Sequence, residues 1–207
     1  MTPELRAALE PVTGEIDSVR PVGGGSISAS FSLLTRGGER YFLKTQAAEL
    51  ADLFDAEADG LAALSDCGCI SVPRPLASGV VAAQSYLLLQ YLDFAGDRDA
   101  AAAELGRRLA EQHGRPMTEF GWPRDNFIGS TPQPNGTTGD WIGFLRDKRL
   151  GFQFELAACN GFAGELQRLG RKLLARLPEF FDETPRASLL HGDLWGGNWG
   201  ALAGGRP

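Results

Sequence analysis

The chain has 207 residues and a mass of 22.2 kDa, enough for one domain or two small lobes. Its 43% hydrophobic and 22% charged residues are typical of an ordinary globular protein. A net charge of −6 argues against a nucleic-acid-binding surface, and no apolar run approaches the ~20 residues that cross a bilayer. The N-terminus has neither region of a signal peptide. We therefore expect a cytoplasmic protein with neither nucleic acid nor a membrane as a partner.

The three cysteines, Cys67, Cys69 and Cys159, are odd in number and lack the Cys-x-x-Cys spacing of common zinc sites. We expect them to remain thiols in a reducing compartment. A basic run between residues 168 and 176 falls at helical spacing, and we interpret it as a solvated helix face.

The first part of the chain combines a short helix with strands and turns. Thr2 can serve as an N-cap and Pro3 suits the first helical position, so a helix is expected over residues 2–10. Leucine and phenylalanine at helical spacing predict a second helix over 47–64. Alternating patterns and turn residues predict strands over 16–22, 27–34 and 40–45, with turns at 23–26 and 36–39.

Helices dominate the remainder. Val72-Pro73-Arg74-Pro75 ends any helix before it, and the apolar run 86–91 is typical of a buried strand. Another short buried strand is predicted at Ser188–Leu190. The other expectations are a helix over 97–113 that ends at Gly114, an ordered loop over 115–139, and two or three helices between 141 and 181.

This order of elements predicts an α+β fold with two lobes. A sheet-rich N-terminal lobe would span residues 1–93 and a mostly helical C-terminal lobe residues 94–207. Because clefts between lobes are common ligand sites, a nucleotide bound between the lobes is the first ligand to suspect.

A run of glycines lies between the first two predicted strands, at Gly23, Gly24, Gly25 and Ser26. Glycines there allow backbone N–H groups to approach phosphate oxygens. The run lacks the pattern of a Walker A loop or of a complete G-x-G-x-x-G. Taken alone, the run is more typical of a plain hairpin turn, because glycine-rich turns are common.

A lysine in an apolar strand needs either a negative partner or a path to solvent. Lys44 follows Tyr41-Phe42-Leu43, and Glu57 lies on the next helix, with Asp55 and Asp59 as competitors. Taken alone, Lys44 could reach solvent along its own apolar stem. Protein kinases, however, use a strand lysine held by a helix glutamate to grip the α- and β-phosphates of ATP.

The stretch His191-Gly192-Asp193-Leu194-Trp195-Gly196-Gly197-Asn198 fits the spacing of the kinase catalytic loop, H-x-D-L-x-x-x-N. In that loop the aspartate accepts a hydroxyl proton and the asparagine ligates Mg²⁺. The alternative is a polar loop that matches by chance. The glycine run and the strand lysine precede it in the kinase order, which favours the catalytic interpretation.

With HGDLW followed by Gly-Gly-Asn, the chain resembles the fructosamine kinase (ketosamine-3-kinase) family, an aminoglycoside-phosphotransferase-like branch of the protein-kinase fold. The stretch DNFIGSTPQPN, residues 125–135, supports the resemblance as strongly as the catalytic loop does. The matching segments cover nearly the whole chain: 23–28, 42–44, 57–61, 72–75, 105–113, 120–121, 125–129, 132–135, 140–141 and 149–150.

The resemblance implies transfer of the ATP γ-phosphate to the 3-hydroxyl of a ketosamine, a glycated amine or protein, in the service of deglycation. By position, Asp193 would be the base, Asn198 would hold Mg²⁺, and Lys44, oriented by Glu57, would bind the phosphates. Further ATP contacts are implied for the backbone of Gly23, Gly24, Gly25 and Ser26 and for main-chain groups of Gln90, Tyr91 and Leu92. His191 and Trp195 are expected on the substrate side, although Trp195 could instead pack within its own loop.

The family continues into a strand with a second Mg²⁺-binding aspartate and then several helices. No acidic residue follows Asp193 in this sequence. We therefore expect an incomplete C-terminal lobe and, for the 207 residues alone, weak or no transfer. Two alternatives remain open: a kinase for another small alcohol or an aminoglycoside, and a non-catalytic nucleotide-binding remnant. The sequence does not reveal the amine partner or the oligomeric state.

Overall fold

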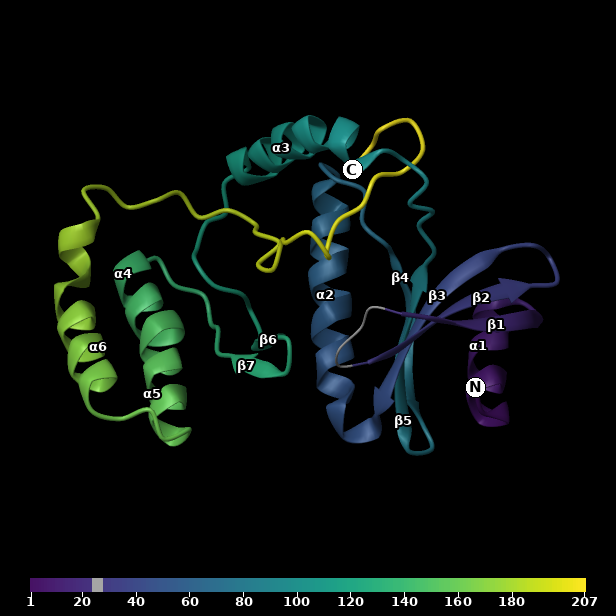
Figure 1. Cartoon of the computed structure of the whole chain (residues 1–207), viewed down its shortest axis with the longest axis horizontal. Coiled ribbons are helices and arrows are strands. Elements are labelled where there is room, and N and C mark those ends of the chain that lie inside the picture. The colour runs from purple at the N-terminus through teal and green to yellow at the C-terminus, as the bar shows by residue number, and fades with distance from the viewer. Residues whose placement is uncertain (24–27) are drawn as a thin grey trace. The chain divides into compact units, whose positions relative to one another are not determined.

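The computed structural model describes residues 1–23 and 28–207 (Figure 1). Gly24, Gly25 and Ser26 of the predicted phosphate-covering turn lie outside these residues. The described residues form two compact units, one of Met1–Gln112 with Leu190–Pro207 and the other of His113–Leu189. The lobe boundary after residue 93 stays a prediction.

The first unit is built on an antiparallel sheet, which has five strands in the described part of the chain, in the order β1-β2-β3-β5-β4. The strands are β1 (Ile16–Val22), β2 (Ala29–Thr35), β3 (Arg40–Ala47), β4 (Pro75–Val81) and β5 (Gln84–Gln90). The strands predicted over 16–22, 27–34, 40–45 and 86–91 correspond to β1, β2, β3 and β5 with small changes in their bounds, whereas no range was predicted for β4.

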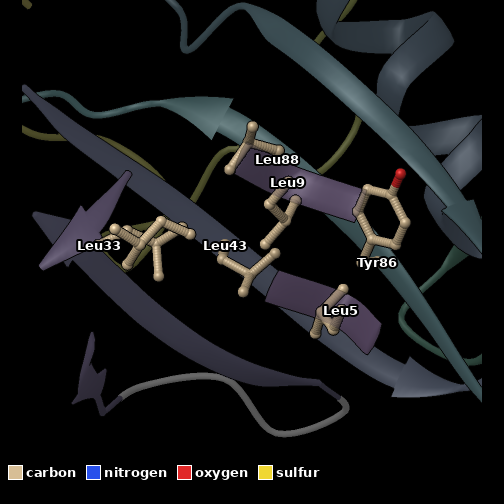
Figure 2. Packing of buried hydrophobic residues seen from close by; sticks show 7 residues of the cluster. Leu5, Leu9, Leu33, Leu43, Tyr86 and Leu88 are labelled. Carbon is tan, nitrogen blue, oxygen red and sulfur yellow. The ribbon is translucent and has the colours of Figure 1, made fainter. Parts of the chain in front are cut away.

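Helix α1 (Pro3–Thr13) covers one face of this sheet. As predicted, Thr2 caps it, because the Thr2 hydroxyl accepts a hydrogen bond of 3.2 Å from the amide of Leu5. Leu5 and Leu9 are one helical turn apart and therefore share a side of the helix. Figure 2 shows them in the core with Leu33, Leu43, Tyr86 and Leu88.

Helix α2 (Ala51–Cys67), preceded by the 3₁₀ turn η1 (Ala48–Leu50), covers the opposite face (Figure 1). Its Phe54 packs against Leu87 and Leu89, with Phe42 beside them. Successive side chains of a strand point to opposite faces of the sheet. On β3, Leu43 therefore faces α1, whereas Phe42 and Lys44 face α2.

Helix α3 (Arg98–Gly114) follows β5 after a short connection and agrees with the predicted helix. The Asp97 carboxylate accepts hydrogen bonds from the amides of Asp99 and Ala100, so it caps the helix. The amide of Gly96 donates to the carbonyl oxygen of Ala201 at 2.9 Å. The last segment of the chain therefore runs beside the start of α3.

The second unit contains a hairpin and several helices. The predicted loop over residues 115–139 is ordered around the hairpin, and its buried Asn135 hydrogen-bonds Arg124, Asn126, Gln133 and Arg149. The elements are β6 (Asn126–Ile128), β7 (Thr131–Gln133), α4 (Trp141–Gly143), the π-helix η2 (Phe144–Gly151), α5 (Phe152–Cys159), α6 (Glu165–Arg176) and the 3₁₀ helix η3 (Leu177–Phe180).

The strand predicted at Ser188–Leu190 is wrong. Ser188 forms only an isolated bridge with Pro116, and Leu190 is 62% exposed. Proline has no N–H with which to extend a ladder, so pairing stops at one residue.

Two other predictions concern the surface and the cysteines. The basic residues of α6 are exposed, and Arg168 pairs with Glu165 and Arg176 with Glu179. Cys67 and Cys69 place their sulfur atoms 3.1 Å apart without forming a disulfide.

None of the described helices combines the length and the apolarity that spanning a membrane requires.

Candidate active site

The ammonium group of Lys44 is held by a carboxylate from the neighbouring helix. Lys44 Nζ lies 2.5 Å from Glu57 Oε2, and the two side chains are 22% and 32% exposed. Nζ also lies 5.8 Å from the centre of the Phe54 ring. The strand therefore presents a positive charge in a fixed position on the α2 face of the sheet.

Helical geometry explains why Glu57 is the partner and Asp55 and Asp59 are not. Glu57 follows Phe54 by three residues, so it shares the side of α2 that packs on the sheet. Asp55 and Asp59 are each two residues from Glu57, a rotation of about 200° around the helix. Both are exposed. The positions of the apolar residues on α2 thus determine which of its acidic residues pairs with Lys44.

The loop over residues 191–198 is closed by its asparagine. The side-chain amide of Asn198 donates to the main-chain oxygen of Asp193 and to its carboxylate Oδ2, each at 2.8 Å. The main-chain amide of Asn198 donates to the carbonyl oxygen of Trp195 at 2.9 Å. Gly192 has a φ of +85°, a conformation that favours glycine. These contacts fix Asp193 and Asn198 relative to each other.

His191 begins the loop and is partly buried. Burial lowers the pKa of His191 below its ordinary value, and the charge of Asp193 opposes this shift only in part. The main-chain amide of Asp193 donates to His191 Nδ1 at 3.4 Å, an interaction that requires an unprotonated nitrogen there. The histidine therefore supports the backbone at the position of the aspartate.

Trp195 both contacts its own loop and faces solvent. Its ring covers Gly197 so closely that a side chain at residue 197 would overlap it. The residue is nonetheless 63% exposed. An aromatic surface is thus displayed two residues from Asp193, as stacking on a sugar would require.

The segment predicted to meet adenine is partly engaged within the protein. The amide of Gln90 donates to the carbonyl oxygen of Arg74 at 2.9 Å, and the guanidinium of Arg40 stacks on the Tyr91 ring at 3.7 Å. Because the Gln90 amide is already bonded, main-chain N–H contacts to a base would fall to Tyr91 and Leu92.

A cavity of about 540 Å³ lies in the first unit but does not coincide with the loop or the ion pair. Its described lining includes Gln90 and Leu92 but not Lys44, Glu57 or the 191–198 loop. The lining residues are Ser65, Gly68, Cys69, Ile70, Ser71, Val72, Arg74, Gln90, Leu92, Glu104, Arg108, Leu202, Arg206 and Pro207.

Oxygen ligands for a cation are present but few. Among residues 1–23 and 28–207, no group of three or more His, Cys, Asp or Glu side chains is placed to hold a metal ion. The side chains of Asn198 and Asp193 lie side by side, since the Asn198 amide nitrogen donates to the Asp193 carboxylate. Mg²⁺ is commonly held by one or two protein oxygens together with substrate phosphates and water. The two side chains fit that role in part.

The structure adds one residue that sequence reasoning missed. Arg98, at the start of α3, donates from Nη2 to the carbonyl oxygen of Gly196 at 2.7 Å and stacks on Trp199 at 4.4 Å. Arg98 and Gly196 are 98 residues apart in the chain, and no local pattern links them. Only the path of the folded chain reveals this contact.

Lys44, Glu57, Asp193 and Asn198 all belong to the first unit. A strand lysine paired with a helix glutamate, together with an Asp-Asn loop, defines the protein-kinase-like class of folds. The backbone agrees: the crystal structure of a candidate fructosamine-3-kinase from Haemophilus somnus superimposes with a TM-score of 0.84 at 23% identity, over 97% of this chain and 68% of that chain.

Within that class the particular family is also clear. The sequence profile of the fructosamine kinase family matches residues 3–207, and the chain belongs to this family. It is 37% identical over 193 residues to the protein named "Probable ketoamine kinase slr1563" of Synechocystis, covering 93% of this chain and 64% of that protein. It is 38% identical over 188 residues to the chloroplastic protein-ribulosamine 3-kinase of Arabidopsis thaliana, covering 89% of this chain and 57% of that protein. The chain thus spans less than two thirds of the length of these relatives.

Proposed function

We propose that this protein transfers the γ-phosphate of ATP to a sugar hydroxyl of a ketosamine. The Lys44–Glu57 ion pair carries the proposal, because it joins two separate elements at 2.5 Å in the arrangement that grips nucleotide phosphates in kinases. Membership of a kinase family supports the same reaction class.

Asp193 is the proposed general base. Its carboxylate is exposed and accepts a hydrogen bond from the Asn198 amide at Oδ2. A carboxylate held in this way can orient a substrate hydroxyl and accept its proton as the phosphoryl group is transferred. Asn198 then has two tasks, since its amide fixes Asp193 while its side-chain oxygen serves as a ligand for Mg²⁺.

Lys44 is the proposed phosphate contact, together with the backbone of Gly23, Gly24, Gly25 and Ser26. Mg²⁺, when bound, would supply charge neutralisation for the phosphates. Gln90, Tyr91 and Leu92 are proposed to border the adenine. The Gln90 amide would not contact the base, because it already donates to the carbonyl oxygen of Arg74.

A ketosamine is the proposed acceptor because relatives with 37% and 38% identity are named ketoamine and ribulosamine kinases. The exposed ring of Trp195, two residues from the proposed base, offers a stacking surface for a sugar. His191 is proposed to support this side of the site through the Asp193 backbone.

A substrate panel tests the proposal. The protein as its gene encodes it would be given ATP and Mg²⁺ with fructose-modified lysine, ribulose-modified lysine, choline or an aminoglycoside, and ADP release would be followed. We expect release with the two ketosamines. Faster release with choline or the aminoglycoside would indicate another small-alcohol kinase. ATP binding without release on any acceptor would indicate a nucleotide-binding protein without transfer.

A further inference from the structure

We propose that Arg98 is a positioning residue that holds the 191–198 loop so that Asp193 and Asn198 keep the geometry of catalysis. The inference rests on the proposed function of this loop. Arg98 lies on α3, outside the loop and outside the ion pair.

One side chain grips the loop on both sides of Asn198. The Arg98 guanidinium donates from Nη2 to the Gly196 carbonyl oxygen at 2.7 Å, two residues before Asn198. Its carbon Cζ lies 4.4 Å from the centre of the Trp199 ring, one residue after Asn198. A planar guanidinium suits this combination, because it can donate in its plane while its face stacks on an aromatic ring.

The location of Arg98 within its helix is unusual for an arginine. It is the first residue of α3, where the positive end of the helix dipole disfavours a cation. Farther along the same helix, Arg107 and Arg108 pair with the carboxylate of Glu104. Arg98 is bonded to a loop carbonyl and a tryptophan face instead, which indicates a role directed at the loop.

Backbone contacts just before α3 place Arg98 in this position. The Gly96 amide donates to the Ala201 carbonyl oxygen at 2.9 Å. A side chain at Gly96 would overlap the main chain of Ala201 and Leu202, and one at Gly200 would overlap the Phe94 ring. The two segments therefore lie in close contact through glycines, which fixes their register and places Gly196 within reach of the Arg98 guanidinium.

A shift of the loop would also displace Asp193, the proposed base. The Asn198 amide binds both the main-chain oxygen and the carboxylate of Asp193, so displacement of Asn198 displaces Asp193. A misplacement of about 1 Å at a reacting group can lower a rate about a hundredfold. Loss of the Arg98 contacts should therefore lower kcat, while KM for ATP and the ketosamine changes little.

Three variants test the inference in the protein as its gene encodes it: Arg98→Ala, Arg98→Lys and the matched control Arg107→Ala. The control arginine lies on the same helix with a side chain 69% exposed. Steady-state kinetics would give kcat and KM, and hydrogen exchange would report the protection of peptides that cover residues 191–199. We expect Arg98→Ala to lower kcat at least about tenfold and to speed exchange in these peptides. The kcat and exchange rate of Arg98→Lys should lie between those of Arg98→Ala and the wild type, since lysine keeps a donor but not the planar guanidinium. Arg107→Ala should match the wild type in both measurements.

Wild-type kcat in Arg98→Ala would overturn the inference, with or without faster exchange. So would a raised KM at unchanged kcat, because that would place Arg98 in substrate binding. If Arg98→Ala does not fold, Arg98→Lys with wild-type kcat and exchange overturns it equally. An inactive wild type would contradict the proposed function instead, and faster exchange in Arg98→Ala but not in Arg107→Ala would still support the restraint of the loop.

Discussion

Lys44 and Glu57 place opposite charges 2.5 Å apart, yet both side chains keep some contact with solvent. Ion pairs with such access to water contribute at most about 1 kcal/mol to stability. The pair is therefore better explained by its positioning of Lys44 than by its contribution to the stability of the fold. A lysine held in one position can meet a phosphate without first losing side-chain entropy.

Glu57→Gln should weaken nucleotide binding with little effect on folding. Without Glu57, Lys44 is no longer held in position to meet a phosphate. Loss of the charge-assisted contact between Lys44 and the phosphate, worth about 1.5 kcal/mol, corresponds to roughly tenfold weaker binding. Calorimetric titration with a non-hydrolysable ATP analogue would measure it. Asp55→Asn is the matched control, since Asp55 is exposed on another side of α2. Equal affinities for Glu57→Gln and the wild type would contradict the role of the pair.

His191 should make the stability of the protein depend on pH. Burial lowers its pKa, so below the ordinary histidine value of about 6.5 the unfolded state binds more protons than the folded state. The free energy of unfolding therefore falls as the pH drops from about 7.5 to about 5.5. Urea unfolding at the two values should show a smaller fall in His191→Gln than in the wild type. An identical fall in both proteins would show that His191 is not responsible.

At the scale of elements, the sheet separates two cores with different tasks. The core between α1 and the sheet is formed mainly by the leucines seen in Figure 2. The core under α2 has Phe54 and Leu89 at its centre and Lys44 with Glu57 beside it. Helix α1 thus anchors the sheet on one face, while α2 brings the Glu57 carboxylate to the other.

Leu9→Ala should destabilise the first unit. Leu9 is fully buried in the α1 core, and truncation of a buried leucine costs about 2–5 kcal/mol. Chemical denaturation would measure the change in the free energy of unfolding. Val12→Ala on the same helix is the control, because Val12 is 46% exposed. A loss no larger than that of the control would contradict the assigned core.

Most elements of the first unit were predictable because each has a local cause. The Thr2 cap, the alternation on β3 and the leucine spacing of α2 lie within single segments. The choice of Glu57 over Asp55 follows from the phase of α2, which the sequence already contains. The strand expected at Ser188–Leu190 failed because apolar composition does not specify a partner. Arg98 was missed because its contact with Gly196 depends on how distant segments pack.

At the scale of the whole molecule, the path of the chain determines which residues work together. The last segment, Leu190–Pro207, returns to the unit formed by the N-terminal residues rather than remaining with His113–Leu189. Asp193 and Asn198 therefore share a compact unit with Lys44 and Glu57. Residues far apart along the chain are thus grouped in one unit.

Transfer of labelled γ-phosphate from ATP to a ketosamine, by the wild type and by Asp193→Asn, tests the central claim most directly. The substitution keeps the shape of the side chain and removes the proposed base. The protein as its gene encodes it would be used, with Asp182→Asn, an exposed aspartate of the second unit, as the control. We expect transfer by the wild type and the control, and a loss of about 10²-fold or more in Asp193→Asn. Transfer by Asp193→Asn at close to the wild-type rate would contradict the account.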